Sequence, residues 1–239
     1  MMPAQFGHRF RAMTLAAPDP GALAVFYSET LGLPVRVEGE IAIVSAGSNE
    51  LRFERGAGAP FYHFAFNIRP LRLEDARAWL AERVTLLRYA ETGEEVVAFP
   101  SWNAHSVYFH DPAGNIVEFI ARHDLKVGQA PNDPADSPFG AADILGLSEI
   151  ALVVDDVRET VRAIREAFGL AVYGGDEGDE VFTAMGDERG LVLAIRNDWP
   201  WLPEKTRLAE AHPVRLEIES SATAPPGTVW RFACYEIRA

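Results

Sequence analysis

Polar side chains alternate with apolar ones on three short segments that have the pattern of β-strands. Because successive side chains on a strand point to opposite faces, the apolar residues mark a covered face and the polar residues mark the other. The polar face carries His63 and Asn67 in HFAFNI, Arg52 and Glu54 in ELRFE, and Glu118 in NIVEFIA. A histidine and a carboxylate on one such face suit a borderline or hard divalent metal such as Zn, Fe, Mn, Ni or Co.

Motifs of several other chemistries are missing from the sequence. No G-x-G-x-x-G run follows a predicted strand, and there is no P-loop, no H-E-x-x-H and no G-x-S-x-G nucleophile elbow. The one cysteine, Cys234, lies in an apolar segment, so we expect it to be inert. The sequence therefore does not support a nucleotide cofactor or covalent serine or cysteine catalysis.

Composition and charge exclude further classes of protein. The 239 residues are 48% apolar and 24% charged, which is typical of a folded globular protein. The 35 acidic and 22 basic residues give a net charge of −13, which disfavours nucleic acids and anionic membrane surfaces as partners. No apolar run is long enough for a signal peptide or a bilayer span. We therefore predict a cytoplasmic protein with a small-molecule ligand and with neither nucleic-acid nor membrane partners.

The sequence contains an internal repeat. Each copy has a short apolar strand, a turn marked by Pro or Asp, an amphipathic helix and then further short strands, over about fifty residues. The opening strands and helices occupy residues 12–33, 63–84 and 149–170. A fourth opening strand at 212–219 is followed by a last strand at 228–239 with no helix between them. The pattern thus predicts three βαβββ units and a truncated fourth.

These repeats predict an α+β fold in which tandem βαβββ units form cupped mixed sheets. Residues 124–143 are rich in Pro, Gly, Asp and Ala, which is typical of a linker, although a long surface excursion within one domain has the same composition. We predict a first domain over residues 1–123, in which two repeats pair around the candidate site. The second domain, over residues 144–239, then holds one repeat and the truncated one.

The repeat and the run HSVYFHDPAGNIVEFIAR resemble the vicinal oxygen chelate superfamily. This superfamily contains glyoxalase I, extradiol ring-cleaving dioxygenases and the fosfomycin- and bleomycin-resistance proteins. The D-P-x-G-N-x-x-E pattern after a strand is the most specific part of the resemblance, which covers residues 9–123 strongly and 145–197 fairly well. The resemblance implies that two units pair into a cup around a divalent metal, with the ligands on the first and last strands of the paired units.

Carried over by position, the resemblance implies His63 and Glu118 as metal ligands. The first repeat has Ala12 and Arg52 at the corresponding positions, and neither suits a metal. Glu54, which shares a strand face with Arg52, is the candidate for the missing ligand, and Glu54 or Glu118 is the candidate catalytic proton acceptor. Alternatively, Arg52 fills the metal position itself, pairs with Glu118 and binds an anionic ligand.

Aromatic and amide side chains are the further candidates for ligand binding. Asn67, Trp102 and Tyr108 share the face of the predicted cup, although simple packing explains the two aromatic residues equally well. The third repeat offers Glu149 at the first-strand position but only Leu193 or its neighbour at the last. We therefore interpret the C-terminal half as mainly scaffold.

Together these observations predict a small-molecule metalloenzyme of the glyoxalase or dioxygenase type. It would be a lyase, an isomerase or a ring-cleaving oxygenase that chelates two neighbouring substrate oxygens and so stabilises an enolate or oxyanion. The alternative is a metal-free ligand-binding or resistance protein of the bleomycin-resistance type, with Arg52 in the metal position. Units that pair between two chains would make a homodimer, and the repeats leave this open.

Overall fold

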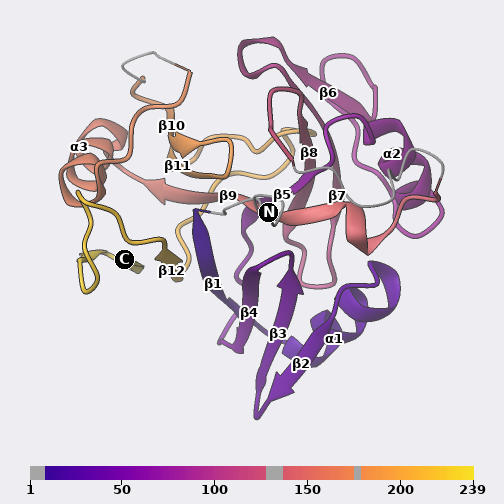
Figure 1. Ribbon diagram of the computed structural model, residues 1–239, viewed down its shortest axis with the longest axis horizontal. Coiled ribbons are helices and arrows are strands. Elements are labelled where there is room, and N and C mark those ends of the chain that lie inside the picture. Colours follow the sequence, from indigo (N-terminus) through magenta and orange to yellow (C-terminus); the bar gives the residue numbers. More distant parts are fainter. Residues whose placement is uncertain (1–8, 128–136, 175–178) are drawn as a thin grey trace, which may run out of the picture.

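The structure is a computed structural model that describes residues 9–127, 137–174 and 179–239 (Figure 1). Its strands form two seven-stranded mixed sheets, which we name sheet A and sheet B. Sheet A contains β1 (Phe10–Ala17), β2 (Val35–Glu38), β3 (Ile41–Ala46), β4 (Asn49–Arg55), β12 (Val214–Ile218), β13 (Val229–Phe232) and β14 (Tyr235–Arg238). Sheet B contains β5 (His63–Ile68), β6 (Val96–Phe99), β7 (Ala104–His110), β8 (Ile116–Arg122), β9 (Ile144–Val154), β10 (Phe182–Asp187) and β11 (Gly190–Arg196).

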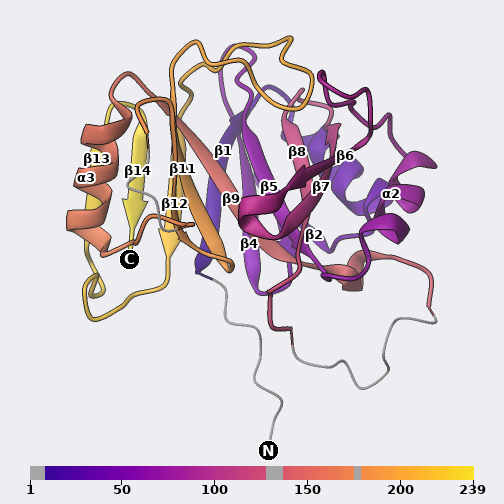
Figure 2. The same ribbon diagram turned by 90° about the horizontal axis from the view of Figure 1, so that it is seen from above.

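Each predicted repeat carries its predicted helix, which confirms the α+β class. The helices are α1 (Pro20–Val25), continued by a π-helical turn over Phe26–Thr30, α2 (Leu73–Ala81) and α3 (Val157–Phe168). Asp19 caps α1 by accepting from the amides of Gly21 and Ala22 at 3.0 and 3.2 Å. Figure 2 shows α2 and α3 on opposite sides of the molecule. Among the described residues, no helix has the length and apolarity to cross a membrane.

The repeats pair differently from the prediction. The strand order is β13-β14-β12-β1-β4-β3-β2 in sheet A and β10-β11-β9-β5-β8-β7-β6 in sheet B. The first repeat therefore pairs with the truncated fourth through β1 and β12, and the second pairs with the third through β5 and β9. The predicted pairing of the first two repeats was wrong, because every opening strand offers the same kind of apolar edge and the alternation within a strand does not choose its partner.

Both sheets take strands from either side of residues 124–143, as a consequence of this pairing. Residues 128–136 of the predicted linker lie outside the described residues. The division into domains over residues 1–123 and 144–239 stays a prediction.

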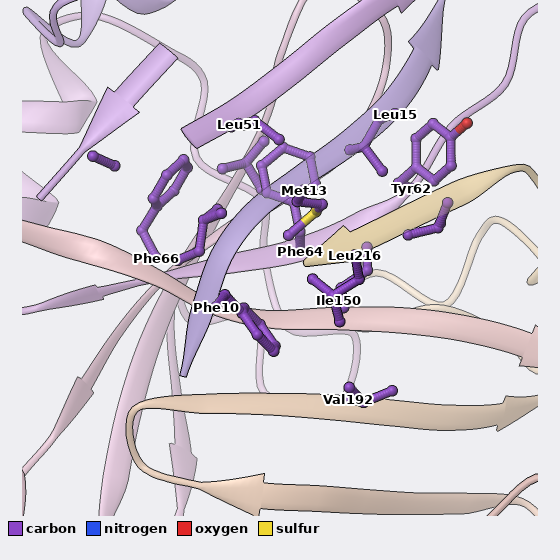
Figure 3. Packing of buried hydrophobic residues seen from close by; sticks show 14 of the residues in the cluster. Phe10, Met13, Leu15, Leu51, Tyr62, Phe64, Phe66, Ile150, Val192 and Leu216 are labelled. Atoms are coloured by element: carbon purple, nitrogen blue, oxygen red, sulfur yellow. The ribbon is translucent and has the colours of Figure 1, made fainter. Parts of the chain in front are cut away.

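The apolar core lies between the two sheets (Figure 3). Side chains from β1, β4 and β12 meet those from β5, β9 and β11, and both groups are buried. They include Phe10, Met13, Leu15, Leu51, Phe64, Phe66, Ile150, Val192 and Leu216. Along β4, β5 and β8 every second residue belongs to this core, so the residues between them point to the outer face of each sheet. The predicted faces of HFAFNI, ELRFE and NIVEFIA are therefore confirmed.

The D-P-x-G-N turn between β7 and β8 joins the second repeat to the first. Asp111 accepts from the backbone amides of Ala113 and Asn115 at 2.9 and 3.1 Å, and from the Asn115 side chain at 2.8 Å. The Tyr27 hydroxyl, which belongs to the first repeat, donates to Asp111 at 3.1 Å. Burial raises the pKa of Asp111 even though all these hydrogen bonds oppose the shift. The motif therefore connects the β7–β8 turn to the first repeat through buried hydrogen bonds.

We expect Asp111→Ala to lower the free energy of unfolding by about 2–4 kcal/mol, because the donors of Tyr27 and Asn115 would stay buried without an acceptor. The matched control is Asp19→Ala, which removes an exposed helix cap and should lower it by about 1 kcal/mol. Urea unfolding followed by circular dichroism measures both values. An equal loss of unfolding free energy in the two variants would contradict the proposed role of Asp111 in connecting the repeats.

Candidate metal centre

His63, Glu118 and Glu149 lie together on the outer face of sheet B. On three neighbouring strands, Ala65 of β5 pairs with Glu118 of β8 on one side and with Glu149 of β9 on the other. Because Ala65 has only a methyl group, the two carboxylates meet above it, and His63 joins them from two residues earlier on β5. One ligand atom from each of the three residues lies within 4.8 Å of the others, and none of the residues is more than 8% exposed. Ligand atoms around a tetrahedral zinc ion are separated by about 3.4 Å, so small side-chain movements would close the set around an ion.

Hydrogen bonds outside the set orient His63 and Glu118. The Nδ1 atom of His63 lies 3.1 Å from the Ile116 carbonyl oxygen and so carries the proton that it donates there. The Nε2 atom then faces Glu118 Oε2 at 3.3 Å. The Ser106 hydroxyl donates to Glu118 Oε1, which leaves Oε2 for the shared space. A ligating histidine typically donates its second ring N–H to a carbonyl or a carboxylate, as His63 does here.

The electrostatics of the set favour a cation. Burial opposes protonation of His63, but its hydrogen bond to Glu118 and the charges of both carboxylates outweigh burial and raise its pKa. Burial, followed by repulsion from Glu118, raises the pKa of Glu149 to about 7 against the attraction of Arg122 and His63. Without a metal, the site must therefore hold protons at neutral pH to offset the buried carboxylates. A divalent ion would replace those protons.

A partly open aromatic cavity of about 90 Å³ is lined by the three residues. Trp102 and Tyr108, which the sequence predicts on this face, are part of its wall. None of its lining residues among those described is a Lys or an Arg. The lining residues are His63, Phe99, Trp102, Tyr108, Glu118, Glu149, Phe182, Leu193, Ile195, Trp199, Trp201 and Leu202. The cavity thus combines one polar patch with apolar walls, as small-molecule sites commonly do.

Asn67 lies on the predicted face but contacts protein groups instead of the cavity. Its side-chain nitrogen donates to the Glu188 carbonyl at 2.9 Å, and its side-chain oxygen accepts from the Ser148 hydroxyl at 3.1 Å. The residue is fully buried. These contacts connect β5 to β9 and to the turn after β10, so Asn67 supports the walls of the site.

Arg52 does not occupy the metal position. It lies on β4 in sheet A, where its guanidinium pairs with Glu50 at 2.6 Å and with Glu217 at 2.8 Å. The predicted pair between Arg52 and Glu118 is not formed, because the first repeat belongs to the other sheet.

Glu54 also belongs to sheet A, and its carboxylate pairs with Arg215 of β12. The second carboxylate near His63 is Glu149, on the strand that we interpreted as scaffold. One signal for Glu149 was present in the sequence, since it stands in its repeat where His63 stands in the second. The wrong pairing of repeats concealed that signal. Leu193, which stands on the last strand of the third repeat, cannot bind a metal.

Comparison with known proteins identifies the fold. No family profile matches the sequence, and no curated protein matches it. A solved structure of a protein proposed to be a dioxygenase, from Bacillus subtilis subsp. subtilis str. 168, has a TM-score of 0.58 at 16% identity and covers 91% of this chain and 72% of that chain. Glyoxalase I from Zea mays has a TM-score of 0.54 at 15% identity, with 88% and 74% covered. A glutamate-to-glutamine variant of the maize enzyme has a TM-score of 0.55 at 13% identity, with 96% and 92% covered.

These similarities establish the fold. The tandem units have the fold of these solved structures, in agreement with the fold that the resemblance implied.

We expect Glu149→Gln to become increasingly stable relative to the wild type as the pH rises from about 4.5 to about 7 in metal-free protein, with no further change at higher pH. The folded pKa of about 7 lies above the ordinary value of 4.5. The contribution of Glu149 to stability is therefore present at low pH and is lost as the carboxyl ionises in the folded state. The glutamine side chain does not titrate, but its oxygen can still accept a hydrogen bond from Arg122. Urea unfolding with a chelator present measures the difference, and Glu54→Gln is the surface control. A difference between Glu149→Gln and wild type that does not change with pH would contradict the assignment.

Proposed function

We propose that this chain, which has the vicinal oxygen chelate fold, is a metalloenzyme that binds a small substrate through two neighbouring oxygens at His63, Glu118 and Glu149. One observation carries the proposal: three buried ligating side chains from three adjacent strands lie together in the wall of a partly open aromatic cavity. The fold supports it, because the solved structures with this fold include glyoxalase I.

The donor set fits a borderline or hard divalent metal. One imidazole and two carboxylates suit Zn, Fe, Mn, Ni or Co, and the mixture does not select among them. The Nδ1 atom of His63 carries the proton, so Nε2 is the atom that would bind a metal. One oxygen of Glu118 accepts from Ser106 and one oxygen of Glu149 accepts from Arg122, so the other oxygen of each carboxylate remains for a metal. Three protein ligands leave further coordination positions for substrate oxygens, which is typical of catalytic rather than structural sites.

A bound divalent ion would supply Lewis acidity to the chelated oxygens and stabilise negative charge on them. The residues of the chain would bind and orient the substrate beside that ion. The aromatic walls would hold a flat substrate and shield the charge interactions beside it from water. Burial and the charges of Glu118 and Glu149 raise the pKa of Tyr108 far above its ordinary value, so its hydroxyl keeps its proton and can donate a hydrogen bond to the substrate.

Glu118 and Glu149 are the carboxylates at this site, and one of them that moved off the ion during the reaction would be placed to take a proton from the substrate. Proton transfer next to a chelated pair of oxygens is compatible with isomerase, lyase and ring-cleaving chemistry. The metal-free alternative depends on Arg52 beside Glu118, and the ion pairs of Arg52 in sheet A leave that alternative without its key residue.

We expect protein purified without a histidine tag to bind about one equivalent of a transition metal. His63→Ala, Glu118→Ala and Glu149→Ala should each weaken metal binding by roughly 100-fold or more, because each removes one of only three protein ligands. Elemental analysis and competition with a chromogenic chelator measure content and affinity.

Arg52→Ala and Glu54→Ala are the matched controls from sheet A, and both should bind metal like the wild type. A wild-type protein that takes up none of Zn, Mn, Ni or Fe(II) would overturn the proposed function. The same holds if the three ligand variants bind metal as tightly as the two controls.

A further inference from the structure

Arg122 is a buried cation next to the metal centre. It is the last residue of β8, four residues after Glu118, and so lies on the same face of the strand. Only 1% of it is exposed, and it is among the largest fully buried side chains of the described chain. Burying a guanidinium is unfavourable unless specific partners compensate for the lost hydration. The partners of Arg122 therefore indicate its role.

Glu149 is the charged partner of Arg122. Nη2 of Arg122 donates to Glu149 Oε1, and it lies 3.4 Å from the Ser148 hydroxyl. The rings of Trp102 and Tyr173 lie on the guanidinium, each with its centroid 5.4 Å from Cζ. The Nε and Nη1 atoms make no hydrogen bond with any described residue. The two rings thus fix the guanidinium by cation–π contact, and its one ion pair is to a candidate metal ligand.

We propose that Arg122 is the positioning residue of the metal centre: it fixes Glu149 as the third ligand and leaves the loaded site with one net positive charge, which selects a singly charged anionic chelator. This inference rests on the proposed function and adds to it the charge class of the substrate.

The positioning follows from the geometry of a glutamate. Its long side chain has several rotatable bonds, and two equivalent oxygens compete for any nearby donor. Arg122 holds Oε1, so the other oxygen of Glu149 is left for the space shared with His63 and Glu118. Ser106 does the same for Glu118. Removing such a partner typically weakens metal binding 10- to 100-fold although no ligand is lost.

The charge selection follows from counting the buried ionic groups. The two carboxylates balance a divalent cation, and His63 is neutral when its Nε2 ligates a metal. The Arg122 charge is then in excess, and the described residues that line the cavity offer no further ionised group to offset it. A buried net charge is unfavourable, so a ligand with one negative charge is preferred to a neutral ligand. A vicinal diol that has lost one proton and a hydroxamate both belong to this class.

The first experiment measures zinc affinity by chelator competition for wild type, Arg122→Met and Arg122→Lys, each also in a Glu149→Ala background. We expect Arg122→Met to bind zinc 10- to 100-fold more weakly, and Arg122→Lys to fall between it and wild type because an ammonium keeps the charge but not the planar fork. With Glu149 removed, the Arg122 substitutions should have no further effect, because they act through Glu149. Arg72→Met, which also replaces a buried arginine, should leave zinc affinity unchanged.

The second experiment uses saturating zinc and two probes, acetohydroxamate, which binds as a monoanion, and imidazole, which is neutral. Arg122→Met should weaken acetohydroxamate binding at least tenfold and leave imidazole binding unchanged. Arg122→Lys keeps the charge and should bind acetohydroxamate like the wild type. Circular dichroism and the melting temperature show whether each variant is folded, and Arg122→Lys alone tests both parts if Arg122→Met does not fold.

The outcomes separate the two proposals. Wild type without zinc affinity overturns the proposed function. Wild type that binds zinc, with Arg122→Met or Arg122→Lys of equal affinity, overturns the positioning role. The positioning role is also overturned if the Arg122 substitutions reduce zinc affinity as much in the Glu149→Ala background as they do in the wild-type background. Equal weakening of acetohydroxamate and imidazole, or the loss of acetohydroxamate binding in Arg122→Lys, overturns the charge selection.

Discussion

The antiparallel pairing of β5 with β9 is the constraint on which the site depends. This ladder places Ala65 between Glu118 and Glu149, and a residue larger than alanine at that position would keep the two carboxylates apart. The same ladder closes sheet B into a surface seven strands wide, so the second and third repeats make one cavity between them. A slip of one residue would turn every side chain of β9 to the opposite face and place Glu149 in the apolar core.

The two sheets use charge in opposite ways although they are built from the same repeat. On sheet A, the outward-facing Arg52 and Glu50 are partly exposed, and their ion pair contributes little to stability because water and salt screen it. On sheet B, the carboxylates of Glu118 and Glu149 are buried, where repulsion between them is strong. Of the described residues, only His63, Glu118 and Glu149 form a group with the spacing of metal ligands. The proposed site therefore belongs to the pair formed by the second and third repeats.

The period-two pattern was sufficient to predict the strand faces, and with them the placement of His63 and Glu118, because alternation is a property of a single strand. Pairing between repeats depends on contacts between residues far apart in the sequence, and no local pattern contains them. The last predicted strand shows a second limit. Residues 228–239 read as one strand, but Ala233 adopts a φ of 49°, which splits the segment into β13 and β14. A left-handed alanine has no sequence signal, since glycine is the residue expected there.

A hairpin between β11 and β12 forms one wall of the cavity, which has a volume of about 90 Å³ and is partly open to solvent. The wall residues on this hairpin are Trp199, Trp201 and Leu202. Polar contacts hold the edge of the hairpin: Lys205 pairs with Glu91 at 2.5 Å, and Arg207 donates to the Gly114 carbonyl at 3.1 Å. Exposed contacts of this kind are weak compared with the core. These polar contacts of the hairpin are therefore weaker than the strand ladders that hold His63, Glu118 and Glu149 in place.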